Sequence, residues 1–265
     1  MHPMTDPVRE FYMNARDYDL ISGHGVAGDV AYFSRLARGA RRVLELACGT
    51  GRVTWPMARA GARVTALDLV GEMLALARER GASENTPVRR RVRLLEADMR
   101  AFALRERFPL IVIPFRAFQH LLTVEEQMDC LACCRKHLTR QGRLVINLFD
   151  PNLRILAAHM QSGLPGPVTR VETRLDGDER LIVWSSRTLS PEQQRMQDQW
   201  VVERFDAQGR SISRRLHTLT LRWCYRFEME HLFARCGFRV LSLEGGFDGQ
   251  PFTHGQEQVW TLGLA

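Results

Sequence analysis

The stretch Val43–Arg52 constrains the fold more than any other part of the chain, because an apolar strand sequence there runs into an acid and a glycine turn that opens a helix. The turn reads Glu45-Leu46-Ala47-Cys48-Gly49-Thr50-Gly51, and Asp68 closes a second apolar strand 17 residues after Gly51. In a doubly wound α/β sheet, such a turn lets the backbone approach a bound nucleoside, and an acid about twenty residues further on accepts the two ribose hydroxyls. The spacing therefore predicts a site for an adenosine-type cofactor.

The glycine turn also distinguishes two classes of adenosine cofactor. A dinucleotide site uses G-x-G-x-x-G, whose third glycine allows close packing of the helix that binds the pyrophosphate. The third position here is Thr54. The pattern Glu45–Gly51 resembles motif I of the class I S-adenosylmethionine-dependent methyltransferases, whose cofactor carries no pyrophosphate. Two alternatives from other classes stay open: an NAD-dependent oxidoreductase, which the missing third glycine disfavours, and a non-catalytic cofactor-binding scaffold.

Helical patterns that end on a glycine and are followed by an apolar strand recur along the chain. The four glycines are Gly61, Gly81, Gly142 and Gly237. A glycine just past a helix supplies the left-handed residue of the cap, and the basic residues before these glycines complement the helix dipole. Repetition of helix, glycine and strand is typical of a parallel α/β sheet, with the wholly apolar run Leu110–Ile113 as a central strand.

A helix is predicted after residue 122 by a capping box, with Thr123 as N-cap and Glu126 three positions later. This helix carries Cys130, Cys133, Cys134 and His137, which are residue types that bind zinc. A tetrahedral site would need ligands from a second element, so we expect no metal here.

The pattern changes between Val168 and Trp223, where strand-like runs are separated by turn signals. Asp176-Gly177 is a two-residue turn typical of a hairpin, and Ala207-Gln208-Gly209 suggests a second one. We therefore expect an inserted antiparallel sheet of three or four strands, after which the chain returns to the core.

The resemblance implies a Rossmann-like, doubly wound and mostly parallel seven-stranded sheet with this antiparallel β subdomain inserted. We expect an N-terminal helical lid in residues 1–38, a cofactor-binding core in 39–166, the inserted sheet in 167–223 and completion of the core sheet in 224–265. In small-molecule N-methyltransferases the insert forms a lid or a dimer surface, so a homodimer through this sheet stays open.

The resemblance places S-adenosylmethionine against three loops and the N-terminal segment. The two glycines of the turn let the backbone pass close to the ribose, Asp68 holds the ribose hydroxyls, and Asp98, just after the third strand, matches the acid that hydrogen-bonds the adenine amino group. The full expected set is Tyr12, Arg16, Glu45, Ala47, Cys48, Gly49, Gly51, Asp68, Leu69, Met73, Asp98, Met99 and Phe115.

The resemblance also places methyl transfer at the loop after the fourth strand, which agrees with the rule that ligands in open α/β sheets bind outside the carboxyl ends of the strands. The expected acceptor-binding residues are Phe115, Arg116, Phe118 and His120, and the catalytic candidates are His120 and Tyr18. An imidazole can take the proton that an amine or hydroxyl acceptor loses. Alignment of the two reactants can also suffice without a base, and both interpretations stay open.

The charge of the chain bears on what kind of substrate it would methylate. The net charge of +7 invites a nucleic-acid hypothesis, yet Lys136 is the only lysine and arginine is spread along the whole chain. The sequence after the fourth strand, Ile113-Pro114-Phe115-Arg116, departs from the Asn/Asp-Pro-Pro-aromatic signature of adenine-N6 enzymes. We therefore expect a small-molecule acceptor and disfavour nucleic acid, with an RNA or protein methyltransferase as the alternative.

No apolar run approaches the roughly 18 residues that span a bilayer, so we expect a cytoplasmic protein without membrane contact, whose six cysteines are reduced.

Overall fold

The structure is a computed structural model that describes residues 7–12, 14–162, 168–175 and 178–265. Contacts divide the chain into two units. One comprises the residues up to Phe11 together with Asn152–Trp223, and the other comprises Tyr12–Pro151 and Cys224–Ala265. We call them the insert unit and the core unit and describe each by itself.

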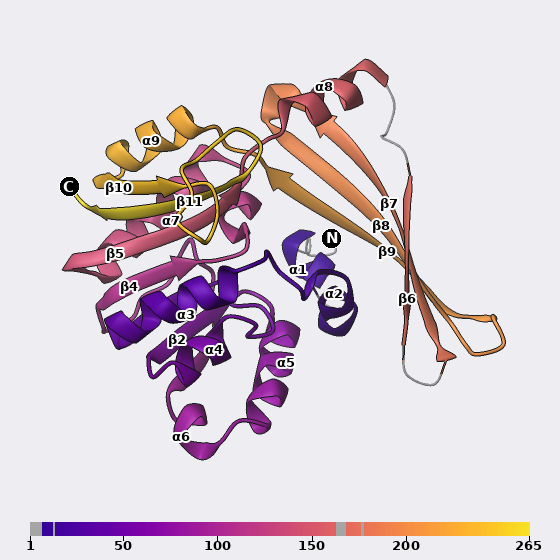
Figure 1. Cartoon of the computed structure of the whole chain (residues 1–265), viewed down its shortest axis with the longest axis horizontal. Coiled ribbons are helices and arrows are strands. Elements are labelled where there is room, and N and C mark those ends of the chain that lie inside the picture. Colours follow the sequence, from indigo (N-terminus) through magenta and orange to yellow (C-terminus); the bar gives the residue numbers. More distant parts are fainter. Residues whose placement is uncertain (1–6, 13, 163–167, 176–177) are drawn as a thin grey trace, which may run out of the picture. The chain divides into compact units, whose positions relative to one another are not determined.

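The core unit is built on a seven-stranded sheet in the order β10-β11-β5-β4-β1-β2-β3 (Figure 1). The strands are β1 (Arg42–Leu46), β2 (Arg63–Asp68), β3 (Val92–Glu96), β4 (Phe108–Ile113), β5 (Leu138–Phe149), β10 (Phe238–Glu244) and β11 (Glu257–Leu264). The pairings from β3 to β5 are parallel, whereas β11 runs antiparallel to both β5 and β10. The predicted fold class, a mostly parallel seven-stranded sheet, is confirmed.

Helices cover both faces of this sheet. They are α2 (Ala15–Ser22), α3 (Asp29–Ala40), α4 (Thr54–Arg59), α5 (Gly71–Ala82), α6 (Thr86–Arg89), η1 (Ala117–His120), α7 (Val124–His137) and α9 (Arg226–Arg235). Alternate strand residues point to opposite faces, so Leu44 and Ile111 belong to one buried apolar cluster while Val43 and Val112 belong to another. The uninterrupted apolar sequence of β4 follows from burial on both faces.

Two of the four predicted glycine caps are confirmed, and two are wrong. Gly61 and Gly237 have φ of 106° and 80° after α4 and α9. Gly81 instead lies inside α5, where a Cβ would stand 2.3 Å from the Trp55 ring, so a close packing contact requires the glycine there. Gly142 lies inside β5, because α7 ends at His137 and the strand begins at once through an irregular register against β4.

The insert unit contains a four-stranded antiparallel sheet in the order β6-β7-β8-β9, as expected for the inserted subdomain (Figure 1). Its elements are α1 (Pro7–Tyr12, whose last residue belongs to the core unit), α8 (Leu153–Ser162), β6 (Thr169–Arg174), β7 (Arg180–Ser190), η3 (Pro191–Gln193), β8 (Arg195–Phe205) and β9 (Ser211–Arg222). The pairing of β6 with β7 confirms the first hairpin, although its Asp176-Gly177 turn lies outside the described residues. Among the described helices, none is long and apolar enough to cross a membrane.

Candidate active site

The site follows from the strand order of the core unit. β1 lies between β2 and β4. The chain leaves β1 toward β2 on one side and leaves β4 toward β5 on the other, so the loops after β1 and β4 diverge at the carboxyl ends of these two strands. Such a switch point is where open α/β sheets bind ligands. The register aligns Leu46 with Leu67 and Asp68 with Glu96, which brings the ends of β1, β2 and β3 to one edge.

The glycine turn (residues 47–51) adopts left-handed backbone at three positions. The φ angles of Ala47, Gly49 and Gly51 are 54°, 56° and 80°. A Cβ at Gly51 would stand 2.8 Å from Trp55 Nε1, so this glycine serves packing. A Cβ at Gly49 would meet nothing within 4 Å, so the backbone there faces open space. The two glycines therefore serve different purposes, and Gly49 is the one that leaves room for a ligand.

Asp68 anchors this turn with both of its oxygens. Gly49 N donates to Oδ2 at 2.7 Å, and Val70 N donates to Oδ1 at 2.9 Å. Burial raises the pKa of Asp68, and these backbone donors oppose the rise. The Leu69 amide is a third backbone donor to this carboxylate, and about four acceptor positions are available on it, so Asp68 can still accept a ligand hydroxyl. The arrangement fits a hydroxyl of a ribose.

The acid that precedes the turn is paired with the residue in the third-glycine position. Thr54 Oγ1 donates to Glu45 Oε2 at 2.6 Å, and the two residues are 0% and 1% exposed. Burial raises the pKa of Glu45 to about 8. A glycine at position 54 would remove this donor and leave the buried carboxyl group of Glu45 without it.

An ion-paired network fastens the N-terminal helix α2 to the glycine turn. Thr50 Oγ1 donates to Asp19 Oδ1 at 2.7 Å, and Arg80 from α5 donates to Thr50 Oγ1 at 2.7 Å and also pairs with Asp19. The segment expected to be a lid is thus joined to the turn itself. Sequence reasoning missed Asp19 and Arg80, because an exposed-looking acid on a helix has no local signal for such a partner.

The N-terminal segment also contacts the loop after β4, which we call the acceptor loop (residues 114–121). The Tyr12 hydroxyl is hydrogen-bonded to His120 Nε2 at 2.9 Å, and the rings of Tyr12 and Tyr18 pack edge to face at 4.9 Å. Burial raises the pKa of Tyr12 well above its ordinary value, and the nearby Tyr18 and Asp68 raise it further. Burial raises the pKa of Tyr18 as well, so both phenols stay protonated, and three predicted site residues, Tyr12, Tyr18 and His120, come together.

The acceptor loop itself begins with two consecutive left-handed residues, Phe115 at φ 51° and Arg116 at φ 65°. The Arg52 guanidinium lies 5.0 Å from the centroid of the Phe115 ring, and Arg116 pairs with Glu257 at the start of β11. Such backbone strain costs about 1 to 3 kcal/mol per residue and persists where the surroundings enforce it. The pairing with Glu257 is one such constraint.

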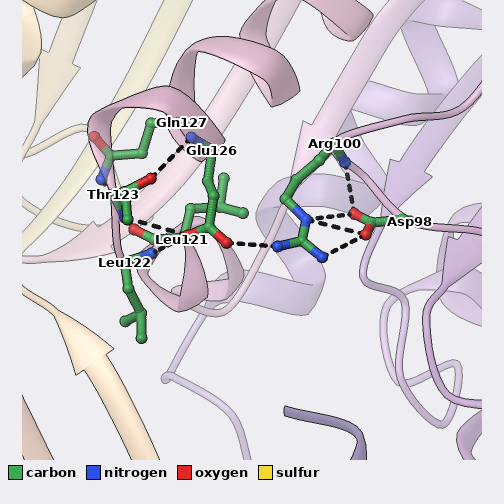
Figure 2. A network of polar contacts seen from close by, with 7 residues as sticks. All are labelled: Asp98, Arg100, Leu121, Leu122, Thr123, Glu126 and Gln127. Atoms are coloured by element: carbon green, nitrogen blue, oxygen red, sulfur yellow. Dashed lines mark hydrogen bonds and ion pairs between the residues drawn. The ribbon is translucent and has the colours of Figure 1, made fainter. Parts of the chain in front are cut away.

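Asp98 lies after β3 and is held by Arg100, whose guanidinium also contacts Glu126 of α7 (Figure 2). The capping box predicted for α7 is confirmed, since the Thr123 side chain accepts from Glu126 N and the Glu126 side chain accepts from Thr123 N. Arg100 is a further residue that the sequence did not single out.

The remaining predicted site residues are placed as follows. Arg16 is exposed and pairs with Glu79, and Phe118 is fully buried in the core cluster. Met73 is buried, packed with Leu69, and Met99 packs against the core. Cys48 is buried within the turn. The roles assigned to all of these residues stay predictions.

His137, from the cysteine-rich helix, is occupied by the backbone. Its Nδ1 is hydrogen-bonded to Cys133 O at 2.7 Å, and Leu104 N donates to its Nε2 at 2.8 Å. Among the residues that the structure describes, no group of three or more histidine, cysteine, aspartate or glutamate side chains is arranged to hold a metal ion.

Comparison with known proteins shows which class of enzyme the chain resembles. A family model described as "Methyltransferase domain" matches residues 43–142. The cypemycin N-terminal methyltransferase of Streptomyces sp is 26% identical over 253 residues, which cover 94% of this chain and 95% of that protein. The solved CcbJ methyltransferase of Streptomyces caelestis has a TM-score of 0.78 at 24% identity, over 98% of this chain and 100% of its own.

A second solved structure was determined with S-adenosylmethionine bound. CalS10, an amino pentose methyltransferase from Micromonospora echinaspora, is 25% identical with a TM-score of 0.71, over 94% of this chain and 97% of its own. These matches agree with the glycine turn, the position of Asp68 at the end of β2 and the strand order. The chain is an S-adenosylmethionine-dependent methyltransferase with a Rossmann-like fold, its methyltransferase domain lies in residues 43–142, and S-adenosylmethionine is its methyl donor.

Proposed function

We propose that the chain methylates an amine of a small molecule, with His120 as the base. The observation that carries this proposal is the hydrogen bond between the Tyr12 hydroxyl and His120 Nε2, formed close enough to Asp68 for the carboxylate to raise the pKa of Tyr12. The names of the similar proteins support an amine, since one is an N-terminal methyltransferase and another an amino pentose methyltransferase.

The cofactor, when bound, supplies an electrophilic methyl group on its sulfonium sulfur. We propose that Asp68 holds its ribose hydroxyls and that Asp98, with Met99, holds the adenine. The backbone of Ala47, Cys48, Gly49 and Gly51 would pass beside it, with Leu69, Met73 and Phe115 as apolar walls. Tyr12, Arg16 and Glu45 complete the proposed cofactor set. The open space at the Gly49 Cβ position and the acceptor capacity of Asp68 support this assignment.

His120 has the proton-transfer role in this proposal. The acceptor nitrogen would use its lone pair to form the new carbon–nitrogen bond while the methyl carbon–sulfur bond breaks and S-adenosylhomocysteine leaves as a neutral thioether. The nitrogen thereby becomes positively charged, and a proton must then leave it. Imidazole exchanges a proton near neutral pH. Tyr12 cannot be the base, because its raised pKa keeps it a phenol, but its hydroxyl fixes the His120 ring. Tyr18 packs on Tyr12, and Phe115, Arg116 and Phe118 complete the proposed acceptor side.

Two variants test these roles separately. His120→Asn should lower kcat about 10²- to 10⁴-fold for an amine acceptor and leave the Kd of S-adenosylhomocysteine unchanged, because His120 acts on the acceptor's proton. Asp68→Asn should instead weaken S-adenosylhomocysteine binding, measured by calorimetry. If His120→Asn turns over at the wild-type rate, His120 is not the base, and alignment of the two reactants accounts for the rate.

We further propose a cytoplasmic location, a homodimer through the inserted sheet, and a lid function for residues 1–38 over a core of residues 39–166, with 167–223 as the insert and 224–265 as core completion. All six cysteines are free, which suits a reducing compartment. Val171, Ile212 and Leu216 of the inserted sheet are exposed apolar side chains, which supports a contact between copies. Light scattering of the purified protein tests the dimer.

A further inference from the structure

A single arginine joins two loops of the core unit whose proposed roles are separate. Arg100 contacts Asp98, beside which the adenine is proposed to bind, and Glu126, which caps the helix that follows the acceptor loop (Figure 2). We propose that Arg100 is a positioning residue that couples adenine recognition at Asp98 to the loop that carries His120. This inference rests on the function proposed above.

The contact with Asp98 fixes the orientation of its carboxylate. Arg100 Nε donates to Oδ1 and Oδ2 at 3.0 Å each, Nη2 donates to Oδ2 at 2.6 Å, and the backbone N of Arg100 donates to Oδ1 at 2.8 Å. The side-chain contacts raise the pKa of Arg100 above its ordinary value. A guanidinium is a planar fork, so it fixes the plane of the carboxylate as well as its position, which an ammonium group does not do.

The contact with Glu126 extends the same network to the acceptor loop. Arg100 Nη1 donates to Glu126 Oε1 at 2.5 Å, while Leu122 N and Thr123 N donate to Oε2 at 2.8 and 3.2 Å. These two amides follow His120 by two and three residues. A rotation of the Arg100 guanidinium therefore moves the Glu126 carboxylate, and this carboxylate holds the backbone amides of Leu122 and Thr123, which follow His120.

The charges of Asp98, Arg100 and Glu126 make this coupling depend on which nucleobase the cofactor carries. One guanidinium lies between two carboxylates, and the three side chains are only 26 to 32% exposed, so the charges are partly shielded from water. Each Asp98 oxygen already accepts two bonds from Arg100, and Nε is shared between the two oxygens, so an amino group that donates to Asp98 takes the place of one Nε contact and leaves the Nη2 contact in place. A carbonyl oxygen at the same ring position would instead face the carboxylate and push it against Arg100.

The test uses S-adenosylhomocysteine and its analogue S-inosylhomocysteine, whose base carries a carbonyl in place of the amino group. In the wild-type protein we expect tighter binding of S-adenosylhomocysteine, with slower hydrogen exchange at the amides of Leu122 and Thr123, followed by NMR. Arg100→Met should lower the affinity ratio of the two ligands at least threefold and abolish the ligand effect on both amides. Arg93→Met, at an exposed arginine that pairs only at 3.9 Å, is the matched control.

Glu126→Gln separates the two halves of the network, because the amide oxygen can still accept from Leu122 N and Thr123 N while the salt bridge is lost. It should keep the affinity ratio and lose the ligand effect on the amides, and it carries the test if Arg100→Met fails to fold. The inference is overturned if ligand-induced protection of these amides is the same in the wild type and in Glu126→Gln. Failure of the wild type to bind S-adenosylhomocysteine at all would instead overturn the proposed function.

Discussion

The buried acid of the glycine-turn motif makes folding stability depend on pH. Burial raises the pKa of Glu45 from 4.5 to about 8, although the Thr54 hydroxyl and Arg52 oppose the rise. Because the folded pKa lies above the unfolded value, the folded protein keeps a proton that the unfolded chain releases between the two values. The stability contributed by this proton is fully present below about pH 4.5 and is lost as the pH rises through about 8.

The magnitude follows from the two pKa values. Each pH unit between them lowers the free energy of unfolding by about 1.4 kcal/mol. Between pH 5.5 and 7.5 the contribution of Glu45 falls by about 2.5 kcal/mol, once partial titration near pH 8 is included. In a chain of this size, that difference corresponds to about 5 to 10 °C in Tm.

Glu45→Gln isolates this effect, because glutamine has nearly the same shape, can still accept from Thr54 Oγ1 and cannot ionise. Urea unfolding of both proteins at pH 5.5, 6.5 and 7.5 should show the variant gaining about 2.5 kcal/mol relative to the wild type across that range. Glu106→Gln, which removes a carboxyl group from a side chain 48% exposed, is the control measured in parallel. If the Glu45→Gln difference is constant, the Glu45 carboxyl does not titrate in the folded protein within this range and the reasoning fails.

Three further substitutions test the local structure around the turn. Gly51→Ala should destabilise the fold by about 2 to 4 kcal/mol in urea unfolding, since it adds a clash with Trp55 to a φ of 80°. Gly49→Ala should lower the free energy of unfolding by only about 1 kcal/mol, because its Cβ meets no protein atom within 4 Å. It should nevertheless weaken S-adenosylhomocysteine binding, measured by calorimetry. Equal stability losses in Gly51→Ala and Gly49→Ala would contradict this distinction. Arg80→Met should release α2, because Asp19 loses its cationic partner, and chymotrypsin should cut α2 faster; an unchanged digestion rate would show that the ion pair does not hold the helix.

Features of the fold that depend on local sequence were predictable. The apolar strands, the capping box at Thr123 and Glu126 and the hairpin between β6 and β7 each follow from neighbouring residues. The glycine caps show the limit of this reasoning. Gly81 has the sequence context of a cap but lies inside a helix, because the Trp55 ring packs where its side chain would be. Only tertiary packing distinguishes such a glycine from Gly61, whose φ is 106°.

The contacts that shape the site are between residues far apart in the chain. Tyr12 and His120 are separated by 108 positions, and Arg116 and Glu257 by 141. Either member of such a pair can be nominated from its chemistry, as His120 was, but no local pattern specifies the partner. The sheet determines which residues become partners, because parallel strands bring the ends of β1, β2 and β4 to one edge.

Asp68 shows how this edge combines folding with binding. Its two oxygens already hold Gly49 N and Val70 N, so the carboxylate keeps the left-handed turn in place before any ligand arrives. The Leu69 amide also donates to this carboxylate, and of its roughly four acceptor positions one remains for a ribose hydroxyl. An asparagine can satisfy only one of the two backbone donors, since its amide nitrogen does not accept. Asp68→Asn should therefore weaken cofactor binding twice over, by losing a hydroxyl contact and by loosening the Gly49 backbone, whereas a residue that served only the ligand would leave the turn unchanged.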